Sequence, residues 1–235
     1  MKRFLSVILM LCILAQFPLQ AAAQVHDANT NSEPSDYFIS VMRLAFTDQD
    51  RSKIITPSGE DVSAAFFHRF AADYQQNTFV NMNRFYKDNN LSLEYTFPEE
   101  PSAKSYARGG SSETVSGKKA VHQYLECSLT RRENCEVGYY FHYSYVVNNN
   151  EGIILDADPP TFEMLYTSFD SAVSWGDAAI EYQNEIRRAV ISPDDTSVRF
   201  YLDMEMAVYS RMITGVEPLA LNYRYPVYYE YTVYA

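Results

Sequence analysis

His142 is the titratable side chain whose position in the sequence best suits chemistry. It lies between Tyr140 and Ser144 on the less apolar face of a predicted strand. A histidine on such a face can act as a general base where the face lines a pocket. The alternative, which we favour, is a partly exposed histidine that is hydrogen-bonded within a sheet.

Asp203 and Glu205 are the carboxylates whose spacing could do related work. They share one face of a predicted strand with Arg199 and Arg211, because side chains two residues apart point to the same side. Neighbouring carboxylates can exchange protons or bind a hard cation. Arginine and acid at alternate positions also form an ordinary charge ladder on a solvated sheet face, and we favour this interpretation.

Tyrosine is unusually frequent, with 20 residues, and alternation divides the tyrosines of the last two predicted strands between two faces. Tyrosine combines a large contact area with a polar tip, so it suits both cores and binding surfaces. The tyrosines on the apolar face are expected in the core: Tyr223, Tyr225, Tyr229 and Tyr231. The others predict an exposed aromatic strip for a partner, a small ligand or a glycan: Tyr201, Tyr209, Tyr228 and Tyr234.

Cys127 and Cys135 predict a disulfide if the chain is exported. Closing a loop this short would stabilise the fold by roughly 2–3 kcal/mol. A metal site would need further ligands, and His122 and His142 do not complete a CxxC-type framework with these cysteines. We therefore expect a structural disulfide and no metal site.

The familiar catalytic motifs do not occur in the sequence. It contains no G-x-S-x-G, H-E-x-x-H, Walker loop or G-x-G-x-x-G. His68 and His122 fall on predicted helices and receive no catalytic role. The net charge is −11, from 19 Lys and Arg against 30 Asp and Glu, which argues against a nucleic-acid partner. We expect no cofactor.

The first 23 residues have the pattern of a signal peptide. A basic start at residues 1–3 precedes an apolar run at 4–14, and Ala21-Ala22-Ala23 supplies small residues before the expected cut. The run is too short for a stable membrane span, so no span is expected after cleavage. Cleavage would leave a net charge of −13 (17 − 30) and remove Cys12. The pattern predicts a periplasmic or extracellular protein with a flexible leader at 24–34 and a single domain at 35–235.

Hydrophobic periodicity predicts an α+β domain with helices first and long strands later. Predicted helices cover residues 35–45, 60–86 (one long helix or a pair), 116–125, 161–166 and 175–191. Predicted strands cover 91–97, 137–147, 153–155, 198–209 and 221–233. Pro226 lacks a backbone N–H, so the last strand should be an edge strand or carry a bulge.

The segment Ser116-Gly117-Lys118-Lys119-Ala120-Val121-His122-Gln123-Tyr124-Leu125 resembles the third helix of the nuclear transport factor two-like and SnoaL-like superfamily. Residues 140–147 resemble the long strand that follows it there. The resemblance implies N-terminal helices packed on a curved antiparallel sheet, a cone with an apolar pocket. Residues 156–195 would be a helical insertion in that fold. A phrase beginning at Asp156 (ADPPTFEML after it) is also similar to one in DKNYY-type exported proteins of unknown role.

Two functional hypotheses follow from these observations. The first, which we favour, is an exported, non-catalytic module that binds a protein or a small molecule. The second is a small-molecule enzyme, similar to an isomerase or hydrolase, that uses His142 or the Asp203 and Glu205 carboxylates in a cone pocket. An enclosed apolar cavity where His142 meets a carboxylate would favour the enzyme. An interior filled by Phe and Tyr, with the acids outside, would favour the binding module.

Overall fold

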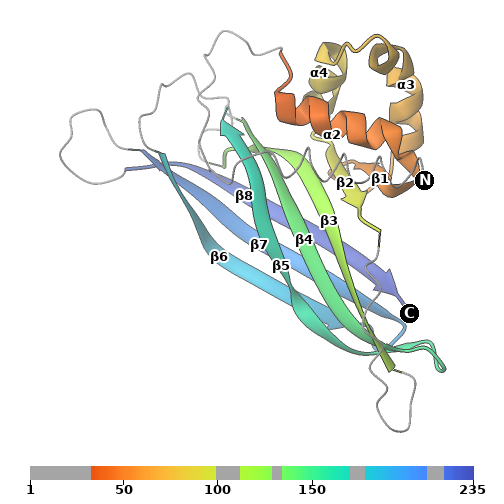
Figure 1. Ribbon diagram of the computed structural model, residues 1–235. Coiled ribbons are helices and arrows are strands. Elements are labelled where there is room, and N and C mark those ends of the chain that lie inside the picture. The colour runs from red at the N-terminus through yellow and green to blue at the C-terminus, as the bar shows by residue number, and fades with distance from the viewer. Residues whose placement is uncertain (1–32, 99–111, 129–133, 170–177, 211–219) are drawn as a thin grey trace.

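The computed structural model describes residues 33–98, 112–128, 134–169, 178–210 and 220–235 (Figure 1). The predicted signal peptide and most of the predicted leader lie outside these residues. The first described part contains α2 (Asp36–Thr47), the 3-10 turn η1 (Gln49–Arg51), β1 (Ser52–Ile55), α3 (Ser63–Gln75), α4 (Val80–Asp88) and β2 (Ser92–Thr96). Six long strands follow: β3 (Ser112–Glu126), β4 (Asn134–Asn148), β5 (Ile153–Phe169), β6 (Ala178–Ile191), β7 (Ser197–Ser210) and β8 (Ala220–Tyr234).

The strands form two antiparallel sheets. Sheet A has the order β1-β2-β3-β4-β5 and sheet B the order β6-β7-β8. Figure 1 shows the helices gathered at one end of the molecule, while the long strands of both sheets run away from that end. The described chain is therefore α+β and consists mostly of strand, with most of β5 and all of β6 in place of the predicted helical insertion.

Sheet A is buried on both faces at its helical end. One face packs on sheet B and forms a core that includes Val137, Tyr139 and Phe141 of β4. The other face packs on the helices, and Phe38 and Tyr86 lie there against the β3 residue Tyr124. Helices, sheet A and sheet B thus make three layers at this end, and two layers elsewhere.

The helix predicted at 116–125 is wrong, because this segment forms β3. Val121 and Leu125 pack in the core between the sheets, whereas Tyr124 packs against the helices. A strand that is buried on both faces does not alternate cleanly between apolar and polar residues. Its apolar residues at 121, 124 and 125 therefore imitate the spacing of a helix face.

The helix predicted at 175–191 is also wrong where the structure describes it, since residues 178–191 form β6. A bulge separates Gln183 from Ile186 in its pairing with β7, and Asn184 there has a positive φ of 54°. The extra residue shifts the inward-facing positions from even to odd numbers. Apolar residues on the two sides of the bulge then recur at intervals of three and four, which is the period of a helix.

The short helix predicted at 161–166 lies within β5. Pro159 and Pro160 suggested the start of a helix, but here they fall where the β4–β5 register shifts between His142 and Ser144. β5 is also the edge of sheet A, where a proline removes no ladder hydrogen bond that a neighbouring strand needs. The insertion predicted near 156–195 is thus strand in every part that the structure describes, apart from the turn before β7.

The remaining predicted elements are confirmed. The helix after Ser35 is present, and the 60–86 region contains the pair α3 and α4. Strands appear near all five predicted ranges. Pro226 lies on β8, which is an edge strand of sheet B. Tyr225 and Tyr229 are buried, and Tyr223 and Tyr231 pack partly buried against the same core.

The buried tyrosines predict alkaline unfolding. Burial is the main cause that raises the pKa of each of these phenols: Tyr37, Tyr86, Tyr139, Tyr229 and Tyr231. A phenol whose pKa is raised on folding stabilises the protein fully below its unfolded pKa, about 10, and loses this contribution as the pH rises through the folded value. Lys119, whose pKa burial lowers, acts in the opposite direction, but it is a single group.

We expect the free energy of unfolding, measured with urea, to fall as the pH rises above about 10. Tyrosinate absorbance from the buried rings should appear together with unfolding. A Tyr139→Phe variant should lose less stability between neutral and alkaline pH than the wild type. Complete tyrosine ionisation in a protein whose stability is unchanged would contradict this account.

Candidate functional site

His142 lies on the face of sheet A that points away from sheet B. Its Nε2 is 4.0 Å from Oε2 of Glu163 on β5, and the two side chains are 39% and 52% exposed. Partial burial and the neighbouring Lys118 lower the pKa of His142, and Glu163 raises it. Tyr140, on the same face, has its ring 4.2 Å from the Lys118 ammonium. These are the surroundings of a partly exposed sheet histidine.

Asp203 and Glu205 lie on the outer face of sheet B. Arg224 of β8 forms an ion pair with Glu205, and Asn184 Nδ2 donates to Glu205 Oε2 over 3.1 Å. Asp203 is exposed. Arg199, which the sequence placed beside them, pairs instead with Glu230 across β7 and β8, at 3.2 Å. This arrangement is a charge ladder on a solvated face.

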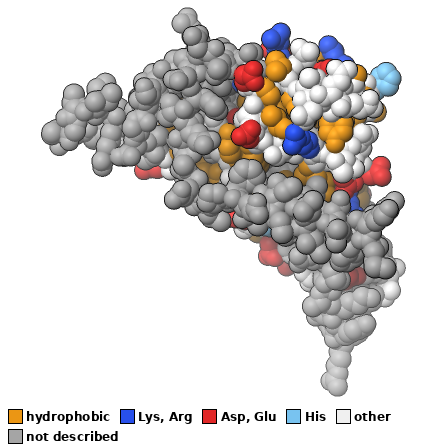
Figure 2. All heavy atoms as spheres, turned by 45° about the horizontal axis from the view of Figure 1, so that its top comes forward, with side chains coloured by type: hydrophobic (Ala, Val, Ile, Leu, Met, Phe, Trp, Pro, Cys, Tyr) orange, Lys and Arg blue, Asp and Glu red, His pale blue; other side chains and the backbone are white. Residues whose placement is uncertain are grey.

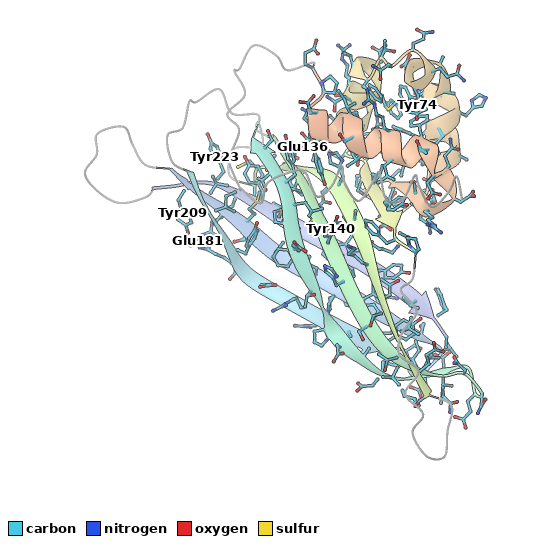
Figure 3. The ribbon with its side chains drawn as sticks, in the orientation of Figure 1. Tyr74, Glu136, Tyr140, Glu181, Tyr209 and Tyr223 are labelled. Atoms are coloured by element: carbon cyan, nitrogen blue, oxygen red, sulfur yellow. The ribbon has the colours of Figure 1, made fainter. Side chains whose placement is uncertain are left out.

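The four tyrosines of the predicted strip do not all lie together. Tyr201 of β7 lies opposite Glu230 of β8 in the ladder. Tyr228 lies opposite Asp203 and is therefore the diagonal neighbour of Tyr201. Tyr234, which is 75% exposed, lies farther along the same face at the end of β8. Tyr209 lies towards the opposite end of β7, where Gln183 donates to its hydroxyl over 2.6 Å (Figure 3). The strip therefore consists of Tyr201, Tyr228 and Tyr234, without Tyr209.

Both predicted disulfide partners are buried in the core between the sheets. Within the described residues the structure forms no disulfide between them. Leu125 pairs with Cys135 across the β3–β4 ladder. Cys127 lies two residues after Leu125 and therefore on the same face of the sheet. Cys135 Sγ donates to the Glu136 carbonyl over 3.7 Å.

A buried histidine–carboxylate pair lies between α2 and sheet A, and the sequence reasoning missed it. His122 Nε2 is 3.0 Å from Glu136 Oε1, and both side chains are almost completely buried. The pair joins β3 to β4 diagonally, since His122 lies opposite Gly138 and Glu136 opposite Tyr124. Reading 116–125 as a helix hid this contact, because only strand pairing brings the two segments together.

Two hydroxyl groups complete the hydrogen bonds of this pair. Ser35 Oγ donates to Glu136 Oε1 over 2.7 Å and also accepts from Phe38 N, so it caps α2. Tyr86 Oη donates to the His122 carbonyl over 2.8 Å and lies 3.2 Å from His122 Nδ1. Figure 3 shows Glu136 at the helical end of β4, next to the first turn of α2.

These contacts give both ring nitrogens of His122 a partner. Nδ1 lies against the Tyr86 hydroxyl and Nε2 against the Glu136 carboxylate. The carboxylate also accepts from Ser35, so the buried polar atoms of the pair are hydrogen-bonded.

Gly138 provides the space in which α2 docks beside this pair. A Cβ at Gly138 would overlap the ring of Tyr37, so the ring lies directly on the β4 backbone. The same ring stacks on Tyr166 of β5, with centroids 4.4 Å apart and planes 7° apart. Burial and the nearby Glu136 raise the pKa of Tyr166 to about 12. Tyr37 thus fastens the start of α2 to sheet A.

The His122–Glu136 pair is sealed from a substrate by the residues around it. Tyr37 and Phe38 of α2 cover it on one side, and Tyr86 of α4 covers it on another. The described residues contain no group of three or more His, Cys, Asp and Glu side chains that could hold a metal ion. The arrangement suits attachment of the helical layer better than proton transfer to a ligand.

A buried ion pair lies between the sheets. Lys119 Nζ donates to Glu94 Oε2 over 3.1 Å, and its ammonium lies 3.7 Å from the centre of the Tyr231 ring. This joins β3 of sheet A to the edge strand β8 of sheet B. The pair and the ring help to close a side of the sandwich where no ladder links the two sheets.

Glu136→Gln removes the carboxylate that joins His122 of β3 to Ser35 before α2. We expect the free energy of unfolding to fall by about 1–3 kcal/mol, because buried polar groups lose a hydrogen-bond partner. The measurement is urea denaturation at neutral pH. Glu163→Gln is the matched control, since its carboxylate near His142 is half exposed, and it should unfold like the wild type. Equal behaviour of the two variants would show that the buried carboxylate does not hold these elements together.

Gly138→Ala places a methyl group where the Tyr37 ring lies. We expect a loss of about 1–3 kcal/mol, typical of an overpacked site. In a Tyr37→Ala background the same change should have almost no effect, because the slot is then empty. The three variants and the wild type form a double-mutant cycle followed by urea denaturation. Additive losses would show that the glycine does not serve Tyr37.

No family model, curated protein or solved structure matches the chain.

Proposed function

We propose that the protein is an exported, non-catalytic binding module that acts through the outer face of sheet B. The observation that carries the proposal is a grid of nine side chains on this face, three from each strand, all exposed or half-buried. We call it the binding face. Its rows are Ile186–Asp203–Tyr228, Arg188–Tyr201–Glu230 and Val190–Arg199–Thr232.

Four of the nine residues of the binding face are arginine or tyrosine, the types that protein interfaces favour. Tyr228 is 54% exposed, and Ile186 and Val190 are among the most exposed large hydrophobic residues of the described chain. Arginine and tyrosine are enriched in interfaces, whereas lysine is depleted. The sequence has no lysine after Lys119, although seven arginines follow that position. All the cations of sheet B are accordingly arginines.

The polar groups of the binding face are held in position. Arg199 Nη1 donates to Tyr201 Oη over 3.1 Å, and Tyr228 Oη donates to Glu230 Oε2 over 2.8 Å. Together with the Arg199–Glu230 ion pair, these contacts orient both rings across β7 and β8. Surface ion pairs of this kind add little stability. Their more important effect is to preorganise the rings, which reduces the entropy lost on binding.

Three features make the enzyme the weaker alternative. His142 and Glu163 lie on an open sheet face, 4.0 Å apart. Asp203 and Glu205 lie on the outside of sheet B, away from the core. The interior positions that a cone pocket would use are filled by rings, such as Phe141 packed on Tyr229 with centroids 4.7 Å apart.

Export is supported by the signal-peptide pattern of residues 1–23. None of the described helices is long and apolar enough to cross a membrane. Figure 2 shows a mixture of positive and negative side chains on the helical end, with small hydrophobic areas between them. That view contains no large area of one charge among the described residues, and so it offers no rival charged surface.

The test is site-specific photo-crosslinking in the native cell. A photoreactive phenylalanine derivative replaces Tyr228 in one variant and His68, an exposed residue of α3, in the control. We expect a discrete adduct from position 228 and none from position 68. Absence of any adduct at position 228, in a variant that folds normally, would exclude the binding face as an interface.

A further inference from the structure

The binding face is locally neutral in a strongly acidic chain. Its charged members are Arg188 and Arg199 against Asp203 and Glu230, whereas the whole chain carries −11. A strongly basic or acidic partner would gain little from such a face. The face suits a partner that has positive and negative groups at matching positions.

The arrangement of the nine residues matches itself. Consider a two-fold axis that lies in the plane of the face and runs diagonally through Ile186, Tyr201 and Thr232. With strands about 4.8 Å apart and alternate residues about 6.8 Å apart, this axis places the strands of the two copies at about 70°, which is closer to the orthogonal than to the aligned arrangement of packed sheets. Residues at mirrored positions of the grid then face each other, and those on the diagonal meet their own counterparts.

Every contact made by this operation is favourable in type. Arg188 meets Asp203 of the second copy, and Arg199 meets its Glu230. Val190 meets the ring of Tyr228. On the diagonal, Ile186, Tyr201 and Thr232 meet the same residues of the second copy. The rotation exchanges a step between strands, about 4.8 Å, with a step between alternate residues of one strand, about 6.8 Å. Side chains of this length can bridge the difference between the two spacings.

Arg188 and Asp203 add a second argument. Both are exposed, and neither forms an ion pair with another described residue. Arg199 and Glu230, by contrast, are already paired within the sheet. The two charges without an ionic partner thus stand at the positions that the diagonal axis brings together.

We propose that the binding face pairs with the binding face of a second copy of this chain, with the strands of the two sheets crossing at about 70°. This inference rests on the proposed function and names its partner. Two three-stranded sheets that cross overlap over a small area, at the low end of interface sizes, so association should be weak and reversible. In a pair of this kind, each Arg188–Asp203 contact occurs twice.

The test uses charge reversal and mixing. Arg188→Glu places two acids opposite each other in a pair of identical copies, and Asp203→Arg places two cations opposite each other. When the two variants are mixed, the two altered residues face each other with opposite charges at one junction, and the native Arg188–Asp203 contact remains at the other. Arg84→Glu, an exposed change of the same charge on α4, is the control. Circular dichroism and thermal unfolding verify that all the variants fold.

Sedimentation velocity of the purified protein from about 1 μM to about 500 μM gives the readout, since small interfaces associate in this range. We expect the wild type and Arg84→Glu to dimerise, and each binding-face variant alone to associate at least tenfold more weakly. An equimolar mixture of the two variants should recover the wild-type association. A monomeric wild type, or a dimer that the two variants do not weaken, would overturn the proposal.

The crosslinking experiment separates this inference from the proposed function. An adduct of twice the chain mass at position 228 supports both. An adduct with a different protein only supports the proposed function and overturns pairing with a second copy. No adduct at position 228 overturns both.

Discussion

The structure depends on one constraint: at the helical end, β3 and β4 must be covered on both faces. Sheet B covers one face, and the helical layer covers the other. The second contact places polar groups of both strands beneath a helix, where each must find a partner. The hydrogen-bonded His122–Glu136 pair, with Ser35 and Tyr86, meets this requirement and attaches α2 at the same time. Gly138 then lets Tyr37 lie flat on the strand.

The sequence predicted those elements whose two sides differ in polarity. In β4, large apolar residues occupy every second position and face sheet B. Ser35 has a capping hydroxyl, which indicates the start of α2. β3 was misread because both its faces are buried, and β6 because the bulge at Asn184 changes which residues face inward. These two errors share one cause. Periodicity reports burial on one continuous face, and both strands break that condition.

The candidate site shows the same division. The outward positions of Tyr201 and Tyr228 followed from alternation along β7 and β8, and the structure places both on the exposed face. The sequence predicted a charge ladder at Asp203 and Glu205. It did not predict which residues pair in that ladder, because the register between neighbouring strands determines the partners. The contribution of β6 to the binding face could not be predicted from a segment read as a helix. For the same reason, no signal in the sequence pointed to His122 and Glu136 as a pair.

The attachment of α2 also bears on the order in which the chain can fold. Ser35 and Glu136 are 101 positions apart, and Tyr37 stacks on a residue of β5 that lies farther on still. The first described helix, α2, therefore has no docking surface on sheet A until β3, β4 and β5 have been made. Closing such long loops is slow, because the entropy of closure is lost before the contacts form. An α2 segment that waits in this way remains undocked during early synthesis, when it has only its own hydrogen bonds, and an isolated helix of this length is marginally stable in water.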